Sequence, residues 1–186
     1  MPKSDKLNFI VEKCTELGVS RIVLVETKRS VKKQINLSRL ERIAISACSQ
    51  SGRIFLPVIE EARFCDALRN AKCGMQNSEN VLGLMLWENA EKGIGEILRL
   101  SKGLTTPDGL QPAISAFCIP HSAFPARVVL FIGPEGGFSH EEADEATRMG
   151  IIPVSLGNQI LRTETAGIVG LTIVAYEMGL LGGQVF

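Results

Sequence analysis

Two short segments in the last third of the sequence carry residue types that could bind a ligand and act on it. GPEGG, at residues 133–137, places three glycines around a proline and a glutamate, and LRTET, at residues 161–165, places Arg162 and Glu164 beside two threonines. Glycines let a backbone approach a flat heterocycle closely and offer it N–H and C=O groups. An arginine near a carboxylate could stabilise an anion and hold it in one orientation.

Each segment also has a purely structural interpretation. GPEGG alone is typical of a tight turn between a strand and a helix, and it matches neither the dinucleotide-binding fingerprint nor a phosphate-binding P-loop. Arg162 and Glu164 could form an exposed ion pair beside a helix cap, which is a common arrangement. The residues alone leave both interpretations open.

Apolar runs lead into both segments and are expected to position them. Residues 128–132 form a continuous apolar run that ends at Gly133, and residues 151–156 precede the second segment. Continuous apolar runs are typical of parallel strands buried on both faces. Since ligands bind beyond the carboxyl ends of strands in open α/β sheets, the two segments are expected at one edge of a sheet.

The rest of the chain alternates strand and helix signals. This alternation predicts an α/β fold with a mostly parallel sheet of five or six strands and helices on both faces. Residues 101–126 predict a long loop, which is usually functional or mobile. The expected strands are 21–26, 54–59, 81–87, 128–132 and 151–156. The expected helices are 7–17, 40–47, 64–71, 94–98, 139–149 and a last helix near the end of the chain. Ser38 is expected to cap the helix over 40–47, a Ser139–Glu142 capping box the helix over 139–149, and Thr163 or Thr165 the last helix.

Composition narrows the classes of function. Lys and Arg together number 20, as do Asp and Glu, so the chain has no overall field that attracts nucleic acid or an anionic membrane. Five cysteines without a C-x-x-C pair and two histidines suggest no metal site and a reducing compartment. The most apolar stretch, residues 168–181, contains Glu177, and the start of the chain is unlike a secretory signal. We therefore expect a cytoplasmic protein without a membrane partner.

Four motifs in order carry a family resemblance. LFIGPEGGFSHEEADEA followed by VSLGNQILRTETA resembles the C-terminal signature of the SPOUT superfamily, and specifically of the family that methylates N3 of a uridine in small-subunit (16S) ribosomal RNA. KLNFIVEKCTELGVSRIVLVETKRSV and RIAISACSQSGR resemble the same family's earlier motifs. The resemblance extends over nearly the whole chain and implies a single SPOUT methyltransferase domain over residues 1–186.

The resemblance also implies a cofactor, a topology and partners. The cofactor would be S-adenosyl-L-methionine, held in a deep trefoil knot near the subunit interface of a homodimer, and the substrate would be 16S rRNA or the 30S subunit. Knots are almost absent from proteins, so periodicity could not have predicted one. Relatives usually carry an N-terminal PUA-like RNA-binding barrel, which we expect to be absent here.

Site residues follow from the resemblance position by position. Arg162 would stabilise the negative charge that develops on the base or grip a phosphate, with Glu164 or Glu135 as orienting carboxylates, and no general base is assigned. Arg29, Lys32 and Lys33 would contact RNA, although a solvated basic loop explains them equally well. The implied cofactor-binding residues are Gly133, Pro134, Glu135, Gly136, Gly137, Leu156, Gly157, Ile160, Leu161, Arg162, Thr163 and Thr165.

Two competing functions remain at this stage. The chain could be a catalytically silent knotted homodimer that binds RNA or a protein partner. It could also be a nucleotide-dependent oxidoreductase on an ordinary doubly wound sheet. The second alternative is weakened because its glycine fingerprint is expected after an early strand, whereas GPEGG follows a late one.

Overall fold

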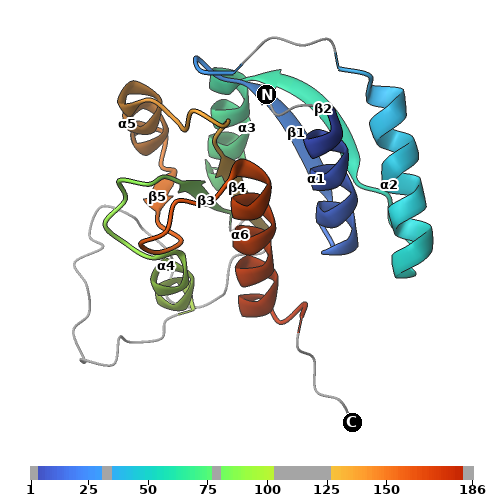
Figure 1. Ribbon diagram of the computed structural model, residues 1–186. Coiled ribbons are helices and arrows are strands. Elements are labelled where there is room, and N and C mark those ends of the chain that lie inside the picture. Colours follow the sequence, from blue (N-terminus) through green and yellow to red (C-terminus); the bar gives the residue numbers. More distant parts are fainter. Residues whose placement is uncertain (1–3, 31–34, 77–80, 103–126, 182–186) are drawn as a thin grey trace.

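The computed structural model describes residues 4–30, 35–76, 81–102 and 127–181, and these ranges contain six helices and five strands (Figure 1). The predicted loop over residues 101–126 lies almost entirely outside the described residues. The elements in chain order are α1 (Ser4–Glu16), β1 (Arg21–Glu26), α2 (Leu37–Ser51), β2 (Val58–Arg63), α3 (Phe64–Gln76), β3 (Val81–Leu86), α4 (Ile94–Ser101), β4 (Arg127–Ile132), α5 (His140–Arg148), β5 (Ile152–Val154) and α6 (Thr163–Glu177).

The described strands pair only in parallel, as expected, but they form two hydrogen-bonded sheets instead of one. β3 lies between β4 and β5, with Leu82 opposite Val128 and Leu84 opposite Ile152. β1 pairs with β2 in a separate two-stranded sheet. α3 contacts β1, β2 and β3, so one helix spans both sheets and holds them side by side.

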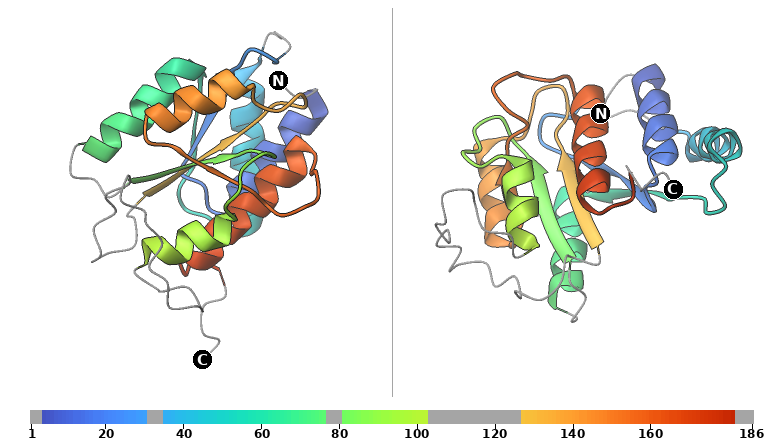
Figure 2. Two further views of the ribbon diagram at one scale, coloured as in Figure 1. Left: turned by 90° about the vertical axis from the view of Figure 1, so that its left-hand side faces the viewer. Right: turned by 90° about the horizontal axis from the view of Figure 1, so that it is seen from below.

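Helices cover both faces of the strand layer (Figure 2). On one face, α3 and α5 pack against β3 and β4 in a core cluster that includes Leu68, Met85 and Phe131. On the other face, α4 and α6 pack against β3 and β5 around Leu84 and Val154, and α1 and α2 cover the β1–β2 pair. β3 is therefore buried on both sides, which explains its continuous apolar sequence.

Three of the predicted boundaries were wrong. α2 is capped by Asn36, whose side chain accepts a hydrogen bond from the Arg39 backbone N–H at 3.0 Å, so Ser38 lies inside the first turn. The second strand begins at Val58, because Pro57 has no N–H for the ladder, and it extends to Arg63.

The third error concerns the start of α6. Arg162 occupies the N-cap position and makes no side-chain capping bond, so neither Thr163 nor Thr165 is the cap. By contrast, the capping box of α5 is confirmed: Glu142 N–H donates to the Ser139 hydroxyl at 3.2 Å, and Ser139 N–H donates to the Glu142 carboxylate at 2.8 Å.

The length and composition of the helices bear on whether the chain could cross a membrane. Among the helices that the structure describes, none combines the length and the apolar character that a bilayer span needs.

Candidate functional site

A cavity of about 370 Å³ lies beyond the carboxyl ends of the three strands of the larger sheet. The lining residues at the end of β3 are 86–88, and those at the end of β4 are 132–135 and 137. Residues 155–162, in the segment after β5, form another wall. Thr163 and Ala166 of α6 and Lys6 of α1 complete the lining. The GPEGG and LRTET segments therefore do meet in one pocket, at the sheet edge that the sequence predicted.

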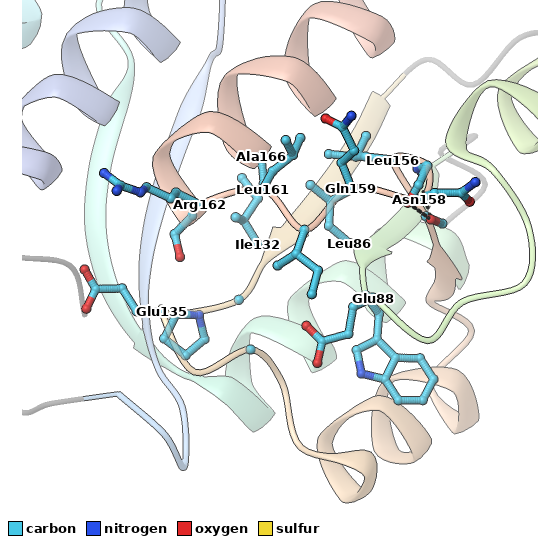
Figure 3. A pocket seen from close by; sticks show the side chains of 18 of the residues that line it. Leu86, Glu88, Ile132, Glu135, Leu156, Asn158, Gln159, Leu161, Arg162 and Ala166 are labelled. Atoms are coloured by element: carbon cyan, nitrogen blue, oxygen red, sulfur yellow. Dashed lines mark hydrogen bonds between the residues drawn. The ribbon is translucent and has the colours of Figure 1, made fainter.

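The lining is apolar in the middle and polar at the ends (Figure 3). Leu86, Ile132 and Leu161 point into the centre of the cavity, where a flat apolar group could pack. Arg162 and Glu135 lie towards one end, and Glu88 lies towards the other. A mainly apolar pocket with a few convergent polar groups is the usual form of a small-molecule site.

The GPEGG loop requires glycine at two positions next to the cavity. Gly137 has φ +66°, a left-handed conformation, and its N–H donates to the Pro134 carbonyl at 2.9 Å. A Cβ at Gly133 would lie 3.2 Å from the backbone nitrogen of Phe138, so a side chain there would push against the main chain. The loop can therefore present its backbone to a ligand only with glycine at these places.

Two further glycines bring α6 close to the larger sheet. A Cβ at Gly167 would lie 3.2 Å from Ile132 Cδ1, and one at Gly170 would lie 3.0 Å from Leu130 Cδ2 and 3.1 Å from Leu86 Cδ1. Because Gly167 and Gly170 have no side chain, leucine and isoleucine side chains of β3 and β4 can pack directly against the helix backbone. This packing fixes the first turn of α6, with Thr163 and Ala166, at the wall of the cavity.

A lysine from the N-terminal helix joins the charged end of the site. Lys6 Nζ lies 2.7 Å from Glu135 Oε1 and 3.5 Å from Glu164 Oε1. The hydrogen bond that Lys6 donates to Glu135 raises the pKa of Lys6 above its ordinary value, with smaller contributions from Glu164. The second carboxylate oxygen of Glu164 is buried and has no hydrogen-bond partner within the described ranges.

Most of the predicted cofactor residues line the cavity. Gly136 and Thr165 are not among the lining residues, and a Cβ at Gly136 would face the Arg29 side chain at 3.5 Å. Glu164 is also outside the lining and reaches the site through its ion pair with Lys6. The predicted residues that do line the cavity are Gly133, Pro134, Glu135, Gly137, Leu156, Gly157, Ile160, Leu161, Arg162 and Thr163.

Sequence reasoning missed several lining residues. Leu86, Trp87 and Glu88 end or follow a correctly predicted strand, so the rule that ligands bind at strand ends could have found them. Lys6 gave no such signal, because it lies on a helix 129 residues from its partner Glu135. The other missed residues are Ile132, Ser155, Asn158, Gln159 and Ala166.

The predicted RNA contacts divide into two groups. Arg29 is exposed, and its Nη1 donates to the Gly136 carbonyl at 2.7 Å, which ties the basic loop to GPEGG. Lys32 and Lys33 lie outside the described residues. A further basic residue, Arg53, donates to the carbonyls of Thr15, Gly18 and Val19 and closes the C-terminal end of α1. Arg53 therefore has a structural role in the fold.

Two further observations concern the histidine beside the site and metal binding. His140 packs edge-on against Trp87, with ring centroids 5.3 Å apart, at the beginning of α5. Within the described part of the chain, no group of three or more His, Cys, Asp or Glu side chains is placed to hold a metal ion.

Comparison with known families defines the class of this domain. A family model described as an RNA methyltransferase domain matches residues 1–175, so the chain belongs to that family.

Individual relatives make the likeness more specific. The chain is 31% identical over 185 residues to ribosomal RNA small subunit methyltransferase E of Rickettsia conorii, covering 98% of this chain and 62% of the relative. It is 29% identical over 192 residues to the protein of the same name from Bacillus subtilis, covering 99% of this chain and 66% of that relative. The chain thus spans about two thirds or less of the length of these relatives.

Solved structures give the same answer for the fold. Ribosomal RNA small subunit methyltransferase E from Neisseria gonorrhoeae, bound to S-adenosyl methionine, superposes with a TM-score of 0.69 and 28% identity, covering 95% of this chain and 62% of that one. A putative methyltransferase from Legionella pneumophila in complex with the same cofactor gives a TM-score of 0.65 and 28% identity, covering 95% and 63%.

Proposed function

We propose that this chain is the catalytic domain of an S-adenosyl-L-methionine-dependent methyltransferase that methylates N3 of a uridine in 16S ribosomal RNA. The observation that carries the proposal is the single cavity formed by GPEGG and residues 155–163 in a chain of the RNA methyltransferase family. Two similar structures, at 28% identity, are described as bound to this cofactor. The name of the curated relatives supplies the ribosomal RNA substrate.

The residues of the cavity fit this methyl donor. Gly133 and Gly137 keep the GPEGG backbone clear of side chains, as a cradle for a nucleoside requires. Leu86, Leu156 and Leu161 provide apolar surface for an adenine ring. When bound, S-adenosylmethionine supplies an electrophilic methyl group on a sulfonium. The groups that would hold it are the backbone of both loops and the polar side chains at the two ends of the cavity.

Arg162 is the residue we assign to charge stabilisation. Uridine N3 carries a proton that must leave before or during methyl transfer, and the base becomes more negative as it does. Arg162 lines the pocket, and a guanidinium placed beside the base would favour that anionic form by offsetting the charge as it develops. Glu164, on the first turn of α6, is the second proposed catalytic residue: its carboxylate faces Lys6 at 3.5 Å in this structure, and in the substrate complex it would orient Arg162.

We also propose that the domain acts as a homodimer through α6 and neighbouring surfaces. α6 is apolar around much of its circumference, and it carries Tyr176 at 65% exposure, with Leu180 just beyond it at 66%. Ile160, which lines the cavity, is also highly exposed. Burial of these side chains by a second copy would remove apolar surface from water and close the cavity near the interface. Sedimentation analysis of Tyr176→Glu should give a monomer where the wild type gives a dimer.

The proposed topology of the C-terminal region is the deep trefoil knot of the SPOUT superfamily. Two contacts support it: Ile94 N–H donates to the Ser155 carbonyl at 3.0 Å, and Ser155 N–H donates to the Lys92 carbonyl at 2.8 Å. The chain after β5 therefore runs along the segment after β3 before it enters α6. An experimental backbone trace that leaves residues 155–181 unthreaded would reject the knot.

Methylation of ribosomal particles tests the proposed function. The protein would be incubated with methyl-labelled S-adenosylmethionine and 30S subunits that lack the modification, and the expected result is label on N3 of one uridine. A cytoplasmic location follows from this proposed substrate. Absence of label despite donor binding would favour the alternative of a catalytically silent homodimer. That alternative predicts that the chain binds RNA without methylating it.

A further inference from the structure

We propose that Lys6 is a positioning residue of the donor pocket, which joins the two loops of the site through the carboxylates of Glu135 and Glu164. The inference rests on the proposed function, because it takes the cavity to be the site of the methyl donor. It assigns part of that site to α1, outside the GPEGG and LRTET segments.

The geometry links three elements at one point. Lys6 projects from α1, Glu135 from the loop after β4, and Glu164 from the first turn of α6. The Lys6 and Glu164 side chains are 31% and 15% exposed, so this end of the cluster is partly shielded from water. Shielded charges interact more strongly than those of a fully exposed ion pair. Lys6 therefore has more influence on local structure than a surface lysine usually does.

The Glu164 carboxylate depends on the Lys6 ammonium. Lys6 Nζ lies 3.5 Å from Glu164 Oε1, and Glu164 Oε2 is buried with no hydrogen-bond partner within the described residues. Without Lys6, the Glu164 carboxylate, whose side chain is only 15% exposed, would lose the cation that faces it while the negatively charged Glu135 remained nearby. Like charges repel and buried carboxylates need partners, so the loop and the helix end would move apart.

Such a movement would open the walls of the cavity. Glu135 and its neighbour Pro134 line the pocket. Glu164 does not, but Thr163, the residue before it, does. A shift of about 1 Å in groups that position a reactant can lower a rate by roughly a hundredfold. We expect the main consequence of losing Lys6 to be weaker donor binding, with little change in the global fold.

Lys13 provides a matched control on the same helix. Its side chain is 33% exposed, and its ammonium lies 2.8 Å from Glu12 and 2.9 Å from Glu16. Lys13 thus resembles Lys6 in exposure and in having two carboxylate partners, but it is not among the residues that line the cavity.

The test measures S-adenosylmethionine binding by calorimetry and the melting temperature of each variant. We expect Lys6→Met to weaken binding by about tenfold or more, a difference well within calorimetric range, and Lys13→Met to change it less than about twofold. Melting temperatures of the two variants should agree to within about 2 °C, because both replace partly exposed ion pairs. Lys6→Arg should restore most of the affinity, since it keeps the positive charge.

A second mutation separates positioning from direct contact with the ligand. Glu164→Gln in the Lys6→Met background removes the repulsion that the first mutation created, so it should recover part of the lost affinity. The effects of the two mutations would then be non-additive, as expected for residues in one network. If the double variant instead binds more weakly than Lys6→Met, the repulsion argument is wrong.

The outcomes distinguish this inference from the proposed function. If the wild type binds no S-adenosylmethionine, the proposed function fails. If the wild type binds and Lys6→Met and Lys13→Met both bind equally well, only the role of Lys6 fails. A loss of folding in Lys6→Met that Lys6→Arg does not reverse would assign Lys6 to the stability of the fold and would also overturn the proposal.

Discussion

The two sheets of this domain are packed in different ways. The sheet of β3, β4 and β5 is covered on both faces by core clusters, and its central strand contains fully buried residues such as Leu84 and Met85. The β1–β2 pair has one smaller cluster, and the chain near the start of β2 exposes Phe55 and Val58. The cavity lies on the better-packed sheet, where rigid strand ends can hold loops in place.

The smaller sheet nevertheless reaches the site through a few polar contacts. Lys6 binds Glu135, Arg29 binds the Gly136 carbonyl, and the Lys28 backbone N–H donates to the buried Glu142 carboxylate at 2.8 Å. The larger sheet thus builds most of the pocket, and the half of the chain that holds the smaller sheet adds Lys6 to it and braces it from outside. Mutation of a pocket residue, Lys6 included, should therefore lower donor binding or activity, whereas mutation of a contact outside the pocket, such as Glu142, should lower stability.

The largest effect is expected from Arg162→Ala. Removing the guanidinium should lower uridine methylation by about a hundredfold or more, as is typical when a preorganised charge-stabilising group is lost. Arg162 is exposed, so the melting temperature should change little. Arg148→Ala, an exposed arginine at the end of α5, serves as the control and should retain activity. A large drop in the melting temperature of Arg162→Ala would give this residue a structural role.

Glu142→Ala should produce the largest loss of stability among the braces. Glu142 is only 2% exposed, and its two carboxylate oxygens accept hydrogen bonds from the backbone N–H groups of Ser139 and Lys28. Its removal leaves one buried and one partly buried N–H donor without this partner, which should cost about 2–3 kcal/mol in urea unfolding. A cost below about 0.5 kcal/mol would show that the contact between the two halves is dispensable.

Gly170→Ala should have a smaller effect and can be paired with Gly95→Ala. The added methyl of the first would meet Leu130 at 3.0 Å and Leu86 at 3.1 Å, so we expect a loss of about 1–2 kcal/mol. The nearest atom to a Cβ at Gly95 is Arg99 Nη2 at 3.8 Å, and alanine there should stabilise α4 by about 0.5 kcal/mol. Equal stabilities would contradict the tight packing of α6.

The smallest effect concerns the exposed pair of Lys28 and Glu141. The Lys28 ammonium, 2.9 Å away, holds the pKa of Glu141 below its ordinary value of 4.5 in the folded protein. The folded state therefore binds this proton less readily than the unfolded state, so the stabilisation is present above pH 4.5 and is lost as the pH falls below it. Glu141→Gln should slightly flatten the fall in melting temperature between neutral and acidic pH. Identical pH profiles would show that solvent screens the pair completely.

Much of this fold could be predicted because most of its strands are short and largely apolar, whereas β2 (VIEEAR), whose bounds were wrong, has three charged residues. The strand over residues 21–26 was predicted with its observed bounds, and it follows a turn at Gly18, where φ is +98°. The split into two sheets could not be predicted, since strand pairing depends on contacts between distant segments. Asn36 and Ser38 are both good capping residues, and only the tertiary packing of α2 decides between them.

The candidate site was predicted in outline for a similar reason. Gly133 and Arg162 follow predicted strands, so local pattern and strand-end position identify them together. The contact of Lys6 with Glu135 depends on how α1 packs against α6, and no local pattern records such packing. Glu88 was missed although it follows a predicted strand, because its single carboxylate has no motif around it.

The most direct test of the account is calorimetric titration of the wild-type protein with S-adenosylmethionine, with a nicotinamide dinucleotide titrated in parallel. The account predicts saturable binding of one methyl donor per chain and no binding of the dinucleotide, because both loops of the cavity belong to one donor site. Absence of heat with the donor, or preference for the dinucleotide, would contradict the central claim that GPEGG and residues 155–163 form a methyl-donor pocket.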